Sequence, residues 1–119
     1  MALRIPIKIK HKDIEIEVKA LLNTGFETDV PIVALPLTIA SQLGLTPGEK
    51  RLYIGPGRIV GEVYLAGKVM VFVKTGNIIR SIEAYAIIEP REDEVILSDK
   101  AIAELGIIID LKHNKWWIT

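Results

Sequence analysis

The chain has 119 residues, of which 50% are hydrophobic and 25% are charged, a composition typical of a folded globular domain. Its 15 basic and 15 acidic side chains balance, so it lacks the broad positive field that drives binding to nucleic acids or anionic membranes. No apolar run approaches the roughly 18–20 residues of a membrane span, and there is no apolar signal-peptide core or cysteine. We therefore expect one cytoplasmic domain, residues 1–119, without a nucleic-acid or membrane partner.

The apolar content is dominated by twenty Ile and nine Val, which favours strands because β-branched side chains fit a pleated surface. Apolar and polar residues alternate over residues 5–10 and again over 14–19, on either side of the polar turn His11 to Asp13. This period of two predicts a β-hairpin. The second strand continues into the apolar segment 20–22, which indicates burial on both faces.

The middle of the chain predicts a short strand, a helix and a second hairpin. Residues 30–37 are apolar but contain two prolines, and from Leu37 to Leu43 the spacing becomes helical, with Gly44 as the C-terminal cap. Segments 51–54 and 58–65 flank Gly55, Pro56 and Gly57, which is typical of a hairpin with a glycine-rich tip.

The last part predicts more strands and one more helix. We expect an alternating strand around residues 69–73 and a long strand over 78–88, followed by an acidic surface loop over 89–94. A buried strand is expected at 95–97, and then a helix from Ser98 to Leu105 that is closed by Gly106. The final strands are expected at 107–109 and 115–119.

The segment that bears on chemistry is Asn23-Thr24-Gly25, which follows the buried apolar pair Leu21-Leu22. It resembles the Asp-Thr/Ser-Gly turn of retropepsin-like aspartic peptidases, with asparagine at the position of the catalytic aspartate. The surrounding elements occur in the order of that family along nearly the whole chain. The resemblance implies an all-β acid-protease half-barrel with one or two short helices.

The resemblance also implies an activity. Peptide hydrolysis by carboxylates needs two of them close enough to share a proton, one ionised to activate water and the other protonated to polarise the carbonyl. One chain supplies one such turn, because none of its five aspartates precedes Thr/Ser-Gly. A homodimer is therefore implied, in which Asn23 holds the catalytic position and Thr24 and Gly25 the structural ones.

Asn23 decides whether this site can work. An amide is nearly isosteric with a carboxylate but cannot titrate, so we expect a chain that is inactive or nearly so as written. Asparagine is here either an engineered replacement of aspartate or the natural residue. The sequence also departs from many retroviral members at Ser98-Asp99-Lys100, where those have glycine followed by an arginine that braces the turn. We expect no arginine brace, and Lys100 is a poor substitute.

By the same resemblance, the substrate would be bound from two sides. Glu27 and Asp29, just after the turn, would lie on one side, and a flap formed by Gly55, Pro56 and Gly57 would lie on the other. The simpler interpretations are two solvated carboxylates and a plain hairpin tip, and Asn-Thr-Gly is also a common loop turn. No cofactor is implied, and no spacing of His, Asp or Glu suggests a metal site. We expect His11 and His113 to be surface residues in turns.

Three functions remain open at this point. The first is a homodimeric aspartic endopeptidase that cleaves peptides or proteins in a groove of the dimer. The second is a non-catalytic peptide-binding or scaffold module that uses the same dimer groove. The third is a β-barrel unrelated to peptidases. Trp116 and Trp117 face opposite sides of a predicted strand, so one could pack inward while the other faces a partner. The resemblance places one of them at a subunit interface, and packing in the core is the competing interpretation.

Overall fold

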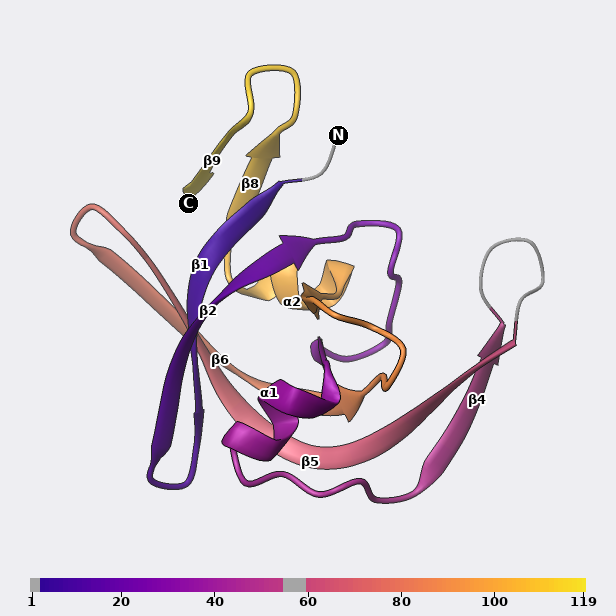
Figure 1. Ribbon diagram of the computed structural model, residues 1–119. Coiled ribbons are helices and arrows are strands. Elements are labelled where there is room, and N and C mark those ends of the chain that lie inside the picture. Colours follow the sequence, from indigo (N-terminus) through magenta and orange to yellow (C-terminus); the bar gives the residue numbers. More distant parts are fainter. Residues whose placement is uncertain (1–2, 55–59) are drawn as a thin grey trace.

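The structure is a computed structural model that describes residues 3–54 and 60–119. Its strands and helices are shown in Figure 1. The strands are β1 (Arg4–His11), β2 (Ile14–Leu22), β3 (Ile32–Leu35), β4 (Lys50–Ile54), β5 (Val60–Thr75), β6 (Ile78–Ile88), β7 (Val95–Leu97), β8 (Ile107–Asp110) and β9 (Lys115–Ile118), and the helices are α1 (Leu37–Gln42) and α2 (Asp99–Glu104). This confirms the predicted all-β class with two short helices. No helix in the described ranges is long and apolar enough to cross a membrane.

The main sheet closes on itself into a barrel. Its strands follow the order β1-β2-β7-β3-β6-β5, and β1 pairs again with β5, while β4 extends the sheet beyond β5. The pairs β2–β7 and β3–β6 are parallel, and the other neighbours are antiparallel. Because the β2–β7 pair is parallel, both strands end at the same edge of the barrel, next to Asn23.

The barrel interior is filled by the alternating aliphatic rows that the sequence predicted. Ile5, Ile7 and Ile9 on β1 are buried, as are the three valines of β5 at 69, 71 and 73, and all belong to one cluster of core residues. Burying a side chain of this size stabilises a fold by roughly 1.5–3 kcal/mol. The outward positions of β1 and β2 carry Lys and Glu, and Lys8 forms an ion pair with Glu15 at 3.8 Å.

The segments 58–65 and 69–73 were predicted as separate strands, but residues 60–65 and 69–73 belong to the single strand β5. The pairing with β6 shifts register between Leu65 and Lys68, and Gly67 adopts φ 95°, a conformation that glycine accommodates without steric cost. The bulge lets one strand serve both the barrel and a hairpin with β4. In the view of Figure 1 that hairpin extends away from the barrel, on the side of the loop that follows β2.

Helix α2 begins at its predicted N-cap, and both helices end at the predicted glycines. Ser98 is the N-cap of α2 and its hydroxyl accepts a hydrogen bond from the Ala101 amide. The chain leaves α1 and α2 through Gly44 and Gly106, both with positive φ. After α2, strands β8 and β9 form a separate two-stranded sheet.

Candidate functional site

The predicted Asn23-Thr24-Gly25 segment forms a turn at the end of β2. The Asn23 amide donates to the Leu97 carbonyl at the end of β7, with 3.3 Å between N and O. Its side-chain Oδ1 accepts the Gly25 amide at 3.1 Å, and its carbonyl accepts the Phe26 amide at 3.1 Å. The side chain therefore organises its own turn, which is a known property of Asn and Asp.

Asn23 keeps one side-chain atom available for other contacts. Oδ1 is occupied by the Gly25 amide, while Nδ2 makes no hydrogen bond to any residue that the structure describes. The side chain is half-buried, so Nδ2 remains accessible to solvent. An aspartate in this geometry would use one oxygen for the turn and present the other.

Gly25 lies close to the Asn23 side chain. A Cβ added at this residue would lie 3.3 Å from Asn23 Oδ1, which is tighter than an ordinary contact. Thr24 is exposed, and its hydroxyl makes no hydrogen bond within the described part of the chain. In this single chain the turn is fixed by the Asn23 side chain, which bonds to the Gly25 amide. The resemblance gives Thr24 a structural position, but its hydroxyl adds no bond to the turn among the described residues.

The loop after the turn is held by the segment that joins β7 to α2. The Asp99 amide donates to the Phe26 carbonyl at 2.9 Å, and the Asp99 carboxylate accepts the Thr28 amide at 2.9 Å. The Ser98 amide donates to the Ile32 carbonyl at 3.0 Å. Residues 97–99 thus contact the loop at its start, middle and end.

Ser98 is fully buried, with 0% of its surface exposed, and its hydroxyl serves two backbone groups. Oγ accepts the Ile32 amide at 3.0 Å and the Ala101 amide at 3.3 Å. It therefore joins the first residue of β3 to the first turn of α2. A glycine at this position could not supply these two side-chain bonds.

Asp99 braces the loop through hydrogen bonds to the backbone of Phe26 and Thr28. Its neighbour Lys100 is exposed and makes no ion pair among residues 3–54 and 60–119. Sequence reasoning identified Ser98 as a helix cap but missed both contacts of Asp99, because they join residues far apart in the chain.

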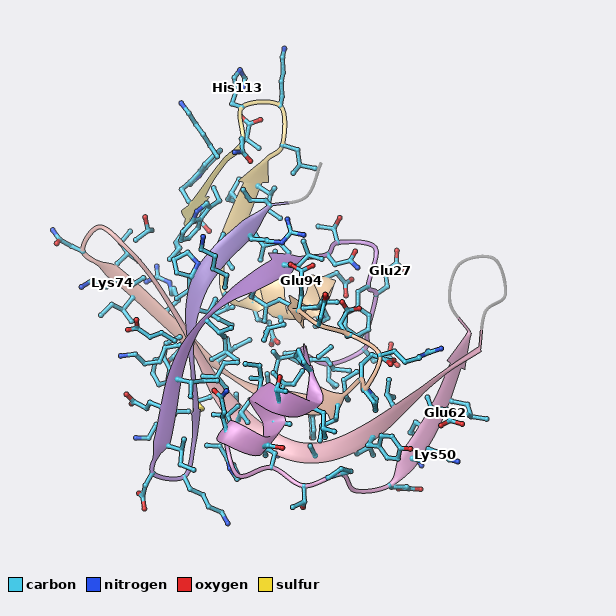
Figure 2. The ribbon with its side chains drawn as sticks, in the orientation of Figure 1. Glu27, Lys50, Glu62, Lys74, Glu94 and His113 are labelled. Carbon is cyan, nitrogen blue, oxygen red and sulfur yellow. The ribbon has the colours of Figure 1, made fainter. Side chains whose placement is uncertain are left out.

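The residues predicted to bind substrate are only partly placed by the structure. Glu27 and Asp29 are exposed on the loop after the turn, and Figure 2 shows Glu27 on the outer side of that loop. The predicted flap residues Gly55, Pro56 and Gly57 lie outside the described residues. The two arms of their hairpin are paired, from Lys50 opposite Tyr64 to Ile54 opposite Val60.

The segment 89–94 was predicted to be an acidic surface loop, and this is wrong for Glu89. Glu89 is buried, and its carboxylate accepts the Arg91 amide at 3.1 Å. Glu94 pairs with the Arg4 guanidinium across to β1, and this hydrogen bond lowers the pKa of the Glu94 carboxyl below its ordinary value. Oxygens of Glu92, Asp93 and Glu94 lie within 4.8 Å of one another, an arrangement that exposed acidic groups often show without a metal.

Both histidines were predicted to be surface residues in turns. For His11 this is wrong, because it is the last residue of β1. Its ring is half-buried and Nδ1 lies 2.7 Å from the Leu43 carbonyl. His113 is exposed at the β8–β9 turn, as Figure 2 shows, and its Nδ1 lies 2.7 Å from Asp110 Oδ2. Neither histidine contacts the Asn23 turn in the described structure.

The tryptophans alternate as the strand period predicts. Trp116 is half-buried and packs against the core, while Trp117 is 44% exposed on the opposite face of β9. Across the hairpin Trp117 pairs with Ile108, which is 37% exposed. This apolar cross-strand pair faces solvent in the single chain.

Comparison of the chain with models of known families and with curated proteins gives no match.

Proposed function

We propose that this chain is one half of a homodimeric aspartic endopeptidase of the retropepsin-like type, in which Asn23 occupies the position of the catalytic carboxylate. Two copies related by a two-fold axis would bring their residues 23 together, and a peptide would bind in the groove between them. As written, the chain would hold peptides without hydrolysing them.

The observation that carries this proposal is the geometry of Asn23. Its Oδ1 accepts the Gly25 amide at 3.1 Å, while Nδ2 stays without a partner among the described residues. An aspartate can replace this asparagine without a change of volume or loss of the turn bond. Its second oxygen would then lie where Nδ2 lies, available to share a proton with the same group of a second chain.

The framework around the turn supports the same proposal. A catalytic group must be held to within a fraction of an ångström, which requires second-layer hydrogen bonds to the surrounding backbone. Leu97, Ser98 and Asp99 supply such bonds along the whole loop from Asn23 to Ile32. A plain surface turn needs no support of this extent.

A partner surface is available near the C-terminus. Trp117 and Ile108 form an exposed apolar pair on the β8–β9 sheet, whose two strands pair with no further described strand. Exposed strand edges and apolar pairs of this kind favour association with another chain. Assigning this surface to the dimer follows the family resemblance.

Asn23 itself favours a second candidate, a peptide-binding module that has lost hydrolysis. Two amides cannot provide a general base. The chain as written would therefore lose the rate enhancement that acid–base catalysis typically gives, roughly 10²–10⁴-fold. In this candidate the groove and the dimer persist, and restoring aspartate at position 23 gives no turnover.

The deciding experiment compares the chain as given with its Asn23→Asp and Asn23→Ala variants. Each is incubated with a mixed peptide library from about pH 3 to 7, where a pair of carboxylates titrates. The proposal predicts cleavage by Asn23→Asp alone.

Two further results have distinct meanings. A dimer that binds peptides but does not cleave them after Asn23→Asp supports the binding module. A monomeric solution mass for all three proteins contradicts both candidates, because a monomer carries only half of the proposed site.

A further inference from the structure

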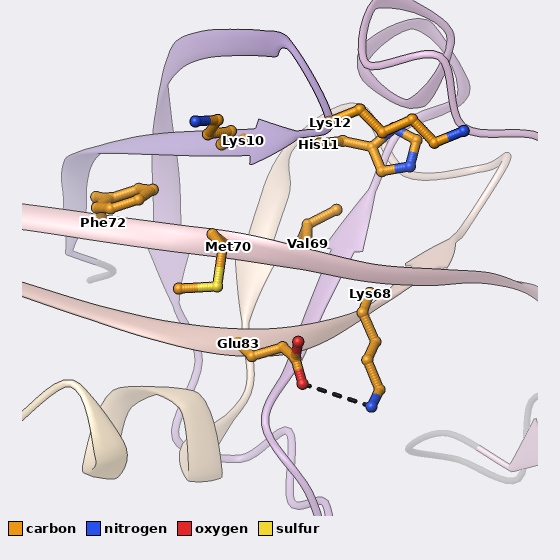
Figure 3. A pocket seen from close by; sticks show the side chains of 8 residues that line it. All are labelled: Lys10, His11, Lys12, Lys68, Val69, Met70, Phe72 and Glu83. Carbon is orange, nitrogen blue, oxygen red and sulfur yellow. Dashed lines mark ion pairs between the residues drawn. The ribbon is translucent and has the colours of Figure 1, made fainter.

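A cavity of about 280 Å³ lies at the opposite end of β2 from Asn23, beside the β1–β2 turn. Figure 3 shows Lys10, His11 and Lys12 on its β1 side and Lys68 with Glu83 across it, on β5 and β6. With about 3.3 Å per strand residue, the nine residues of β2 separate it from the Asn23 turn by roughly 30 Å along the strand.

The cavity is electropositive. Three ammonium groups line it against the single carboxylate of Glu83, which leaves a local charge of two positive. Glu83 is already paired with Lys68 at 3.4 Å, and the Lys68 ammonium also lies 5.2 Å from the centre of the Tyr85 ring. Lys10 and Lys12 form no ion pair within the part of the chain that the structure describes.

The turn that presents Lys12 is held in a strained conformation. Lys12 has φ 54°, in the left-handed region that glycine or asparagine occupies more readily. The neighbouring His11 ring holds the turn against the C-cap of α1, since Nδ1 lies 2.7 Å from the Leu43 carbonyl and must donate its proton to that oxygen.

The floor of the cavity is apolar. Val69 is buried, and Met70 and Phe72 are half-buried beneath the lysines. A ligand that fits must therefore combine a negative group with an apolar or aromatic part. A phosphate monoester carries between one and two negative charges near neutral pH, which matches the local charge of two positive better than a single carboxylate does.

We propose that this cavity binds a small organic phosphate, with the phosphate between Lys10 and Lys12 and the apolar part on Met70 and Phe72. The site does not depend on the proposed peptidase function. Its volume of about 280 Å³ lies just below the roughly 300–1,000 Å³ of typical small-molecule pockets, so a compact monoester is a better fit than a dinucleotide.

Phenyl phosphate is a suitable probe, titrated into the full chain while backbone amide shifts are recorded by NMR. The proposal predicts saturable shifts confined to residues 10–12 and 68–72, weaker binding of inorganic phosphate, and none of phenol. Equal binding of phenyl phosphate and inorganic phosphate would show that only charge is recognised and would overturn the proposed use of the apolar floor.

The Lys12→Gly variant separates binding from folding. Glycine relieves the strained turn, so this variant should unfold at a higher denaturant concentration and yet bind phenyl phosphate at least about threefold more weakly. Lys19→Ala is the matched control, because Lys19 is an exposed lysine of β2 that does not line the cavity. Unchanged binding by Lys12→Gly, or equal losses in Lys12→Gly and Lys19→Ala, would overturn the site.

Discussion

The Asp99 carboxylate accepts a hydrogen bond from the Thr28 amide at 2.9 Å, although the two residues are 71 positions apart in the chain. The same residue donates its own amide to the Phe26 carbonyl. This pair of contacts fixes the loop after Asn23 to the start of α2. A catalytic turn on a loop without such support would not keep its geometry.

Removing the Asp99 carboxylate should loosen that loop. For Asp99→Ala we expect a loss of about 1–2 kcal/mol in the free energy of unfolding, since the half-buried Thr28 amide loses its acceptor. Hydrogen exchange at Thr28 should become about tenfold faster. Asp99→Asn keeps an acceptor oxygen and is the control. Equal exchange at Thr28 in both variants would show that the carboxylate does not hold the loop.

Ser98 should be among the most sensitive polar residues of the chain. Ser98→Ala leaves the Ile32 and Ala101 amides without their acceptor, at a cost of about 1–3 kcal/mol in unfolding free energy. The exposed Ser41 of α1 is a matched control, and Ser41→Ala should change stability by less than about 0.5 kcal/mol. Chemical denaturation of both variants measures the difference, and similar values would contradict the assigned role of the Ser98 hydroxyl.

The two tryptophans should separate association from folding. If the proposed dimer forms through the β8–β9 sheet, Trp117→Lys should abolish it while leaving the stability of the single chain nearly unchanged, because Trp117 lies outside the core. Trp116→Ala should instead lower stability by about 2–4 kcal/mol, because Trp116 packs against the core cluster. Sedimentation analysis and thermal unfolding distinguish the two. If Trp117→Lys remains dimeric, another surface forms the interface.

The Arg4–Glu94 pair should contribute an acid-sensitive component of stability. The Arg4 hydrogen bond lowers the pKa of the Glu94 carboxyl, so the folded protein binds this proton less readily than the unfolded chain does. The contribution is therefore complete above the ordinary carboxyl pKa of about 4 and is lost as pH falls through the folded value. Urea unfolding should show a stability difference between the chain and Glu94→Gln that disappears on acidification. A difference independent of pH would contradict this assignment.

The sequence predicts the parts of the fold that depend on neighbouring residues. The alternation in β1 and β2 and the helix ends at Ser98, Gly44 and Gly106 carry local signals, and all are confirmed. The continuous course of β5 was missed because Gly67 interrupts the alternating pattern, although a bulge preserves the pairing on either side of it.

The candidate site is only partly accessible from sequence for a related reason. The Asn23 turn is local and was predicted at the correct position, at the end of β2. Its support by Asp99 depends on the parallel pairing of β2 with β7, which no local pattern encodes. The burial of Glu89 was missed for a different reason, because acidic segments are normally exposed to solvent.

The most direct test of the central claim mixes the chain with its Asn23→Asp variant, allows subunits to exchange, and records peptide cleavage against the fraction of variant at constant total protein. If two aspartates must meet across a two-fold axis, the rate follows the square of that fraction, so an equal mixture has about a quarter of the activity of the pure variant. A rate proportional to the fraction, about half at equal mixture, would contradict the shared site. Absence of cleavage by the pure variant would contradict the peptidase itself.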